Sequence, residues 1–449
     1  MFSPSATDET LTLRDHAVSG GRGSAEFAES IWDLDPNSDH APLVDTREQL
    51  LHLVAEAFEF AHNLLCCYLY AAFSLKRQGS GDLSRIEAQA VERWREAVMG
   101  VAVEEMTHLL LVGNLAVSIG GDVHLNRPNL PVAEGYHPAG IVIELTPFDM
   151  QTLDHFIYLE RPQQDDLSDS PAFTPTSDLV RGARHGARLM PSSHDYQSIA
   201  QFYASIQSGF KTLARKLGEP KLFVGDRTCQ IGPEVVSMTG LSAVHDLASA
   251  LRAISTIVEQ GEGSSIDSDD SHFSRFKQIK VEYEALLSDR SGFAPARPAA
   301  RNPVMRMPTS SEDRVLIDHP QAAAMLDLAN ALYNQMLRLV AQSFAKDIAS
   351  GSRRQLLDGA IGLMRVFAAV SEHLTTLPAS AEGHTNAGVT FAMLRATEPL
   401  REAGREWNLV AERLVELAQG MRQVCAGIDH LQWAVAKLDD LARTFKSGG

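Results

Sequence analysis

The stretch between residues 84 and 119 constrains the fold more than any other part of the sequence. Its start carries the pattern of a capping box, Ser84 followed three residues later by Glu87, which begins a helix. Apolar residues then recur at helical spacing up to Gly120-Gly121, a typical helix end. A helix this long buries its apolar stripe by packing against other helices, so we expect a helical bundle around it.

A carboxylate and an imidazole interrupt that apolar stripe. Glu105 and His108 are three residues apart, so they share one helix face. The same face carries Val98, Val101 and Val112 and is therefore the one that turns toward the core. Burying both polar groups costs free energy unless they have a partner. A metal ion would be such a partner, and a hydrogen-bonded Glu–His pair in the core is the alternative that this short motif leaves open.

The helix expected before it, over 45–75, carries a second pair with the same spacing. Asp45 and Glu48 form its capping-box pattern, and Glu59 and His62 follow on its apolar part. We interpret Glu59 as a ligand, because a lone buried carboxylate needs a partner. For His62, a core or rim position bonded to a backbone carbonyl is favoured over a place in the site.

Two more candidates come from later in the chain. A helix is expected over 243–260, and Glu262 lies eighteen residues, or five whole turns, after Val244 on its apolar face. Glu262 would thus face the core if the helix extends that far. His272 opens another expected helix, over 272–288, and two phenylalanines that follow it favour an inward orientation.

Other polar residues near these helices have ordinary structural interpretations. The helix expected over 196–216 offers only Gln201, roughly opposite its apolar stripe, so a solvated glutamine and a site role stand equally open. Asp269 is interpreted as the N-cap of the next helix. Tyr68 and Tyr203 are interpreted as core packing, with a place in a pocket wall as the alternative.

Together the candidates form a known type of metal centre. A four-helix bundle that binds two irons takes a Glu from each of two helices and a Glu-x-x-His from each of the other two, and three of these four contributions have candidates here. Carboxylate and imidazole ligands without a thiolate suit iron or manganese, with zinc as a further candidate. The sequence predicts metal binding by Glu59, Glu105, His108, Glu262 and His272.

The order of these patterns predicts an all-α protein of four parts. Residues 1–44 form a flexible arm, 45–290 the metal-binding bundle with long insertions, 291–315 a linker and 316–449 a C-terminal helical domain. The other helical patterns lie at 148–159, 320–349, 353–377 and 404–444. A short strand at Ile141–Leu145 is the one expected departure from helix.

Charge and composition limit the partners and the compartment. The chain has 40 Lys and Arg against 57 Asp and Glu, a net charge of −17, so we expect a small-molecule substrate and neither a nucleic acid nor a membrane as partner. The four cysteines form no CxxC pair and are interpreted as buried, reduced thiols. No signal peptide is visible, and the most apolar run, Leu64 to Phe73, is too short to cross a bilayer. We therefore expect a cytoplasmic protein.

Several long stretches, in order along the chain, carry a family resemblance. They include EFAHNLLCCYLYAAFSL (59–75), VEEMTHLLLVGNLAVSIGG (103–121), ELTPFDMQTLDHFIYLERP (144–162), IVEQGEG (257–263) and SHFSRF (271–276). In these stretches the chain resembles the ferritin-like family named for iminophenyl-pyruvate dimer synthase, that of the chromopyrrolate-type synthases of violacein and rebeccamycin biosynthesis. The resemblance implies a ferritin-like four-helix bundle with a metal centre at the five predicted ligands. Gln201 departs from the family, which commonly has Glu there, and the departure would remove one carboxylate ligand.

These patterns and the resemblance lead to two functional hypotheses. The first is a non-haem oxidoreductase with one or two irons that activates O₂ or peroxide and, as the resemblance implies, couples imines derived from amino acids. Its substrate would be a small aromatic amino-acid derivative. The second is a metal-poor scaffold or accessory binding protein in a biosynthetic complex, which Gln201 favours. In either case the C-terminal helices would pack on the bundle or form a homodimer interface.

Overall fold

In the computed structural model, the described residues belong to one compact unit, His40–Gly449. They are residues 44–447 except 80, 133–135, 138–140, 163–166, 174–188, 197, 264–269, 307–313 and 394–404, with the backbone alone at 262, 263, 405 and 447. The all-α prediction is confirmed. The helices are α2 (Arg47–Ser74), α3 (Arg85–Ser118), α4 (Met150–Leu159), α5 (Ile199–Leu217), α6 (Glu219–Leu222), α7 (Leu247–Val258), α8 (His272–Asp289), α9 (Pro320–Ser343), α10 (Ser350–Leu374), α11 (Arg405–Val424) and α12 (Gln432–Ser447).

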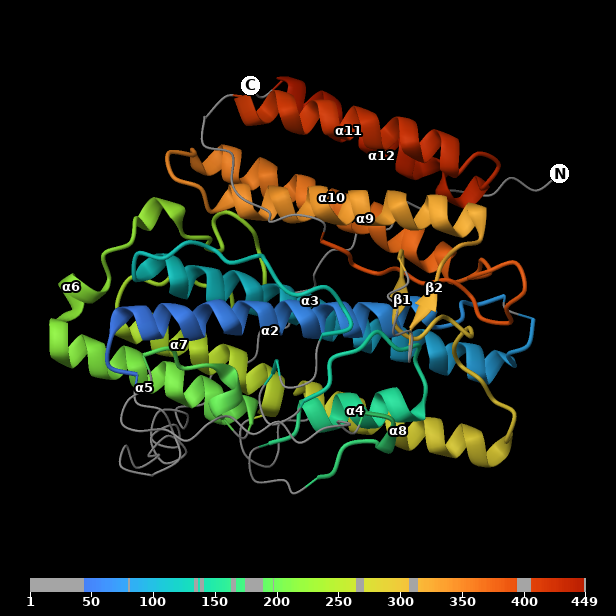
Figure 1. The fold of residues 1–449 in the computed structure, drawn as a ribbon, viewed down its shortest axis with the longest axis horizontal. Coiled ribbons are helices and arrows are strands. Elements are labelled where there is room, and N and C mark those ends of the chain that lie inside the picture. The colour runs from blue at the N-terminus through green and yellow to red at the C-terminus, as the bar shows by residue number, and fades with distance from the viewer. Residues whose placement is uncertain are drawn as a thin grey trace. The chain divides into compact units, whose positions relative to one another are not determined.

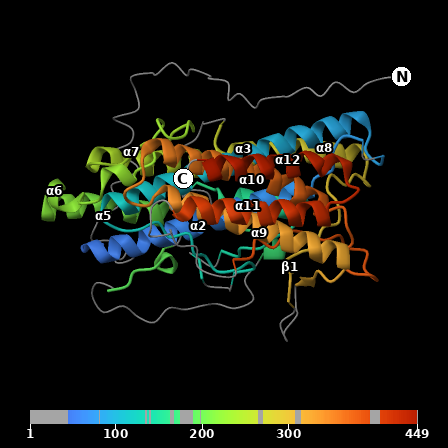
Figure 2. The ribbon, with the colours of Figure 1, turned by 90° about the horizontal axis from the view of Figure 1, so that it is seen from above.

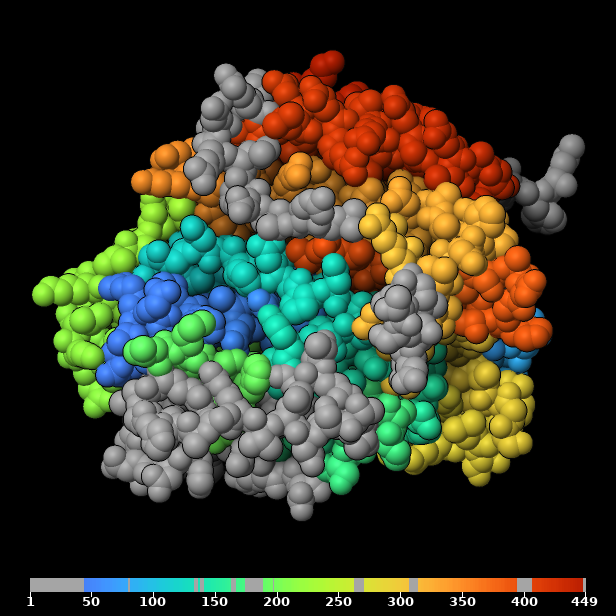
Figure 3. Space-filling model, in the orientation of Figure 1, coloured from blue at the N-terminus to red at the C-terminus, as the bar shows by residue number. Residues whose placement is uncertain are grey.

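The helices of this unit form layers on either side of α2 and α3 (Figure 1). α5 and α7 pack on one side of this central pair and complete a four-helix bundle, and α4 and α8 pack together and extend that side. On the other side α9 and α10 form a pair, of which α10 contacts α2, and α11 and α12 lie over them (Figure 2). In the space-filling view the residues of α9 to α12, orange and red, gather along one side of the bundle (Figure 3). The C-terminal helices are therefore packed on the bundle.

The helix starts show how closely local sequence fixes the fold. The predicted capping box of α3 is confirmed: Ser84 Oγ accepts the backbone N–H of Glu87, whose carboxylate accepts the N–H of Ser84. The box predicted for α2 at Asp45 is wrong by one residue. Thr46 is the N-cap, and its partner is the side chain of Gln49, an amide that serves as well as a carboxylate.

Two other predictions differ from the structure. The pattern at 404–444 is two helices, because Gly427, at φ 79°, turns the chain between them. The strand predicted at Ile141–Leu145 is wrong, because these residues form no strand. The backbone of Leu145 bonds instead to a single residue, Asn302: its carbonyl accepts the backbone N–H of Asn302, and its N–H donates to the side-chain oxygen of Asn302. In the described part of the chain the one strand pair is parallel, with β1 (Pro303–Val304) inside the predicted linker and β2 (Val315–Leu316) at its end.

The two central helices are apolar over an unusual length. By length and composition alone α2 and α3 could each cross a membrane. The apolar stretch is therefore longer than the run from Leu64 to Phe73 that the sequence analysis considered. However, 72% of the most apolar window of each helix is buried inside the structure. This burial is what core helices of a soluble bundle show. The four cysteines are buried and free, as predicted.

Candidate metal centre

α3 carries Glu105 and His108 into the core on one face, as their spacing predicts. Both side chains are buried, and Nδ1 of His108 lies 3.3 Å from Oε1 of Glu105. Val98 and Val101 are fully buried on the same stripe. The apolar residues of α3 thus supply the burial that holds both polar groups inside the bundle.

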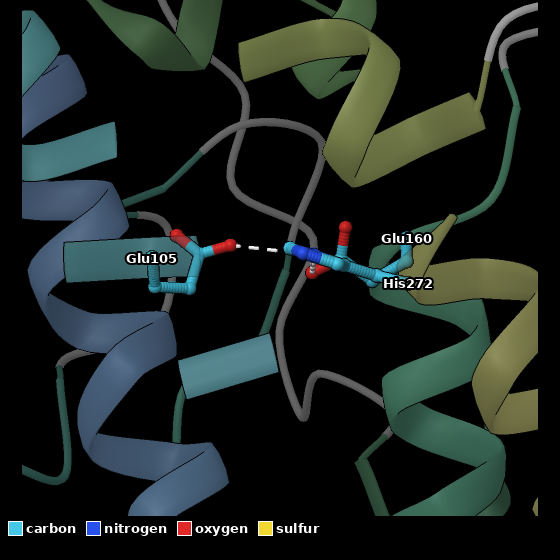
Figure 4. A group of neighbouring side chains, drawn as sticks. All are labelled: Glu105, Glu160 and His272. Carbon is cyan, nitrogen blue, oxygen red and sulfur yellow. Dashed lines mark ion pairs between the residues drawn. The ribbon is translucent and has the colours of Figure 1, made fainter. Parts of the chain in front are cut away.

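His272 approaches the same carboxylate from α8. It is the first residue of that helix and fully buried, and Ser271 is the N-cap; Asp269, the predicted N-cap, lies outside the described residues. Nδ1 of His272 lies 3.4 Å from Oε1 of Glu105 and 3.5 Å from Oε1 of Glu160 (Figure 4). Two segments far apart in the sequence therefore meet at Glu105.

The third member, Glu160, was missed by the sequence analysis. It follows the last residue of α4 and is 3% exposed. A signal for it exists: Leu153, Phe156 and Glu160 are spaced three and four residues apart, so the carboxylate continues the buried stripe of that helix. The hydroxyl of Tyr68, on α2, donates a hydrogen bond to its Oε1 atom.

Glu105, Glu160 and His272, here called the carboxylate cluster, have the features of a metal site. One ligand atom of each lies within 4.8 Å of the others. Within the described part of the chain, Nδ1 of His272 is buried without a hydrogen-bond partner, although two carboxylate oxygens face it. Neighbouring ligand atoms lie about 3.0–3.4 Å apart around an ion with bonds of about 2.1 Å. The separations from Nδ1 of His272 to the two carboxylate oxygens, 3.4 and 3.5 Å, are close to this range, so the donor set fits one metal ion.

Glu104 fixes the orientation of His272 from outside the carboxylate cluster. Its Oε2 atom lies 2.8 Å from Nε2 of His272, and Arg275 forms an ion pair with the same carboxylate at 2.8 Å. With the Nε2 proton directed at Glu104, the neutral imidazole presents the lone pair of Nδ1 to the cluster. Histidine ligands of metals commonly hold such an outer carboxylate.

The charges of the site balance with a divalent ion. Burial alone would lower the pKa of His272, but the surrounding carboxylates, Glu160 foremost, outweigh it and raise that pKa to about 10. Burial alone would raise the pKa of Glu160, and His272 outweighs it, so that this pKa lies below its ordinary value. Arg275 neutralises Glu104, which leaves the two negative charges of Glu105 and Glu160. A protonated His272 balances one of them, whereas a divalent ion beside neutral His272 balances both.

His108 lies next to the carboxylate cluster but outside it. Its Nε2 atom lies 3.0 Å from the amide oxygen of Gln260, in the π-helical turn η5 (Glu259–Gly263) that follows α7. The other ring nitrogen of His108, Nδ1, faces Glu105. His108 is nevertheless not part of the compact group of three ligand atoms. Glu105 is shared between His108 on one side and the cluster on the other.

Of the two other predicted ligands, Glu59 has different partners, and the side chain of Glu262 lies outside the described residues. Both oxygens of Glu59 are engaged elsewhere, Oε1 by Nε2 of His124 at 2.8 Å and Oε2 by the hydroxyl of Tyr136 at 2.7 Å. Those partners come from the segment after α3, which helical periodicity does not place. Glu262 lies in η5, and because its side chain is outside the described residues, its role stays a prediction.

The remaining polar candidates also lie apart from the carboxylate cluster. His62 is buried, as favoured, but its partner is the hydroxyl of Tyr333 and not a backbone carbonyl. Gln201 is half-buried near the start of α5 and does not belong to the buried Glu–Glu–His group.

A small apolar cavity adjoins the carboxylate cluster. Glu105, His108 and Glu160 line its polar end. The rest of its described wall comes from α2, α5, α7 and η5 and consists of Phe60, Ala61, Leu64, Ile199, Tyr203, Ile257, Val258 and Gly261. The space open to the centre of a water molecule is about 20 Å³, which is room for about one water molecule or ion. Glu105 and Glu160 thus border a small, mainly apolar cavity between the bundle helices.

Comparison with known proteins assigns the class. The ferritin-like family model matches residues 54–281, which span α2 to α8 and contain the carboxylate cluster. The chain belongs to the ferritin-like family, and the predicted ferritin-like bundle is confirmed. A crystal structure of a ferritin-like protein from Caulobacter vibrioides is similar to 71% of this chain and 96% of that one, with 20% identity and a TM-score of 0.41.

Two curated relatives confirm the more specific resemblance. One is the dichlorochromopyrrolate synthase of Lentzea aerocolonigenes, 26% identical over 90% of this chain and 42% of the relative. The other is the 2-imino-3-(indol-3-yl)propanoate dimerase of Chromobacterium violaceum, 27% identical over 76% of this chain and 34% of the relative. The chain thus spans less than half the length of the curated relatives it matches.

Proposed function

We propose that this chain is a metal-dependent oxidoreductase that couples small aromatic imino acids. The observation that carries the proposal is Nδ1 of His272, buried without a hydrogen-bond partner between the carboxylates of Glu105 and Glu160. The donor set has no thiolate and suits iron, with manganese and zinc as further candidates. The substrate class follows from the relatives, one of which is named as a dimerase of 2-imino-3-(indol-3-yl)propanoate.

The residues of the site divide into ligands and supports. Glu105, Glu160 and His272 would hold the ion, and a bound iron would supply the redox chemistry that passes electrons from the substrate to O₂ or peroxide. Glu104 keeps the Nε2 proton of His272 away from the ion. Tyr68 holds the Oε1 atom of Glu160 by donating a hydrogen bond to it. Both supports fix ligand atoms before a substrate arrives, which lowers the cost of reorganisation.

The apolar cavity supports an aromatic substrate. Phe60, Ile199 and Tyr203 offer an apolar wall to a ring, and a bound ring would displace water from that wall. The present volume is smaller than an indole ring, so side chains of this wall have to move when such a substrate binds.

Metal analysis followed by an assay tests this function. The protein is expressed with added iron, manganese or zinc, and the metal content of wild type and Glu160→Gln is measured by mass spectrometry. We expect one ion per wild-type chain and a large loss in the variant. The loaded protein is then incubated with the imine of tryptophan, generated in place by an amino-acid oxidase, and the coupled product is sought by liquid chromatography and mass spectrometry.

A scaffold or accessory role is the alternative that this experiment separates. Protein that holds no metal under any of the three conditions overturns the enzyme proposal and supports the scaffold. Protein that holds the ion but forms no product with any aromatic imine retains the metal site and overturns the proposed substrate class.

A further inference from the structure

A second, larger cavity lies between α9 and α11, in the C-terminal helices. Its volume is about 320 Å³, within the range of roughly 300–1,000 Å³ that small-molecule sites occupy. Its described wall consists of Ala331, Asn334, Gln335, Arg338 and Arg413. These described residues include two cations and no carboxylate, so the wall is rich in hydrogen-bond donors.

One of these donors is buried without a partner. Gln335 is 3% exposed, and its Nε2 atom makes no hydrogen bond with any described residue. The neighbouring Asn334 differs, because its Nδ2 atom donates to the carbonyl oxygens of Asn330 and Ala392. Buried amide groups in folded proteins almost always have a partner, so an acceptor from outside the chain would complete this wall.

Neither arginine of the wall is held in a buried ion pair within the part of the chain that the structure describes. Arg338 is exposed and forms no ion pair with any residue that the structure describes. Among the described residues Arg413 forms its ion pair with Glu416, at 2.6 Å and one turn along the same helix, and the side chain of Glu416 is 66% exposed. In a chain with 57 acidic and 40 basic residues, a cavity whose described wall carries two arginines and no carboxylate is unexpected.

We propose that this cavity binds a small organic anion that carries a carboxylate or a phosphate group. The two guanidinium groups would hold the charged oxygen atoms of the ligand. A guanidinium group is planar and can donate two parallel hydrogen bonds, which suits both the two oxygens of a carboxylate and the several oxygens of a phosphate. The amide of Gln335 would donate its free N–H to another oxygen of the ligand. This site goes beyond the proposed oxidative function, because it uses neither the carboxylate cluster nor the cavity beside it.

Calorimetric titration of the full chain tests the proposal. The probes are inorganic phosphate and malonate, each added at constant ionic strength. We expect saturable binding to wild type and an affinity at least about tenfold lower in the double variant Arg338→Gln/Arg413→Gln. The probe that binds more tightly identifies the class, phosphate or carboxylate. Gln335→Leu should also weaken binding, while its apolar side chain removes the unpaired amide and leaves the fold at least as stable.

The chain offers a matched control for the arginines. Arg443, on α12, pairs with Asp440 one turn away, as Arg413 does with Glu416, but it does not line the cavity. Arg443→Gln should therefore bind both probes as wild type does. The proposal is overturned if neither probe binds wild type saturably, or if the double variant and Arg443→Gln bind alike. Circular dichroism confirms that each variant is folded. If Gln335→Leu does not fold, the double variant alone tests the proposal, because Arg338 is exposed and Arg413 partly exposed.

Discussion

Two buried polar clusters lie on opposite faces of α2 and balance their charge in opposite ways. The carboxylate cluster contacts α2 through Tyr68. The second, here called the Arg127 cluster, joins Arg127 to His62, Cys66 and Tyr333. His62 and Cys66 are one turn apart on α2, and Tyr68 is about 200° around the helix from Cys66. The first cluster has an excess of carboxylate, whereas the second holds a cation without one.

The Arg127 cluster serves to fasten segments together. Arg127 donates hydrogen bonds to the hydroxyl of Tyr333 at 3.0 Å, the carbonyl of Phe391 at 2.7 Å and the carbonyl of Pro128 at 2.9 Å. These partners belong to α9, to a segment before α11 and to the segment after α3. A single buried guanidinium thus links the C-terminal helices to the bundle.

The sign of the charge decides which cluster can take a metal. In the Arg127 cluster, burial and then Arg127 hold the pKa of His62 well below its ordinary value, and burial raises the pKa of the Cys66 thiol. Both groups are therefore neutral, and the cluster carries one positive charge that repels a metal cation. In the carboxylate cluster negative charge remains in excess, so a metal cation would balance it. Burial of polar groups alone therefore does not indicate a metal site. A buried excess of negative charge does.

Removing a ligand should have the largest effect and separate the two clusters most sharply. We expect His272→Ala to lose the bound metal while keeping its helical content, because α3 and α8 are held by apolar contacts and not by the ion. His108→Ala is the comparison, since it leaves the three ligand atoms in place and should retain metal with lower affinity. Elemental analysis and circular dichroism measure both. Full metal content in His272→Ala would move the site elsewhere.

The reverse experiment alters the Arg127 cluster. Arg127→Met leaves the buried carbonyl oxygen of Phe391 and the partly buried carbonyl oxygen of Pro128 without this donor, so we expect the free energy of unfolding to fall by about 3 kcal/mol. The metal content of the folded variant should equal that of wild type. Urea unfolding and elemental analysis give the two values. A variant that loses metal in proportion to stability would show that the clusters are not independent.

A smaller effect is expected outside the ligands, at Glu104. Glu104→Gln keeps an oxygen that accepts the Nε2 proton of His272 but removes the charge that favours it. We expect a metal affinity about tenfold lower, near the low end for outer partners of histidine ligands. Competition with a chelator measures it, and Glu284→Gln, a partly exposed carboxylate on α8, is the control. Equal affinities in the two variants would contradict the positioning role.

The smallest expected effects are changes of the free energy of unfolding with pH. The slopes that the two clusters contribute should have opposite signs. In metal-free protein the pKa of His272, at about 10, lies above the ordinary 6.5, so its contribution to stability is complete below pH 6.5 and is lost as the pH rises toward 10. The pKa of His62 lies below 6.5, so stability is lost as the pH falls below 6.5. Each slope is at most about 1.4 kcal/mol per pH unit. Unfolding of wild type, His272→Gln and His62→Phe across this range measures them, and slopes unchanged by either substitution would contradict the assignment.

The sequence by itself determined the helices and the direction of several side chains. Helical periodicity and the capping box at Ser84 fixed α3, and the spacing of Glu105 and His108 fixed their common burial. These features could be predicted because they depend on residues a few positions apart in one helix. The all-α class and the family resemblance rest on the same local patterns, repeated along the chain.

Only the tertiary structure decided which carboxylates meet. Periodicity shows that a side chain faces inward, but not which element packs opposite it. Glu160 enters the cluster from the end of α4, whereas Glu59, also buried and on α2, is bound by His124 and Tyr136. Both outcomes depend on segments without a helical repeat, whose course is set by long-range packing, and so no spacing within one helix could separate the ligand from the carboxylate that has other partners.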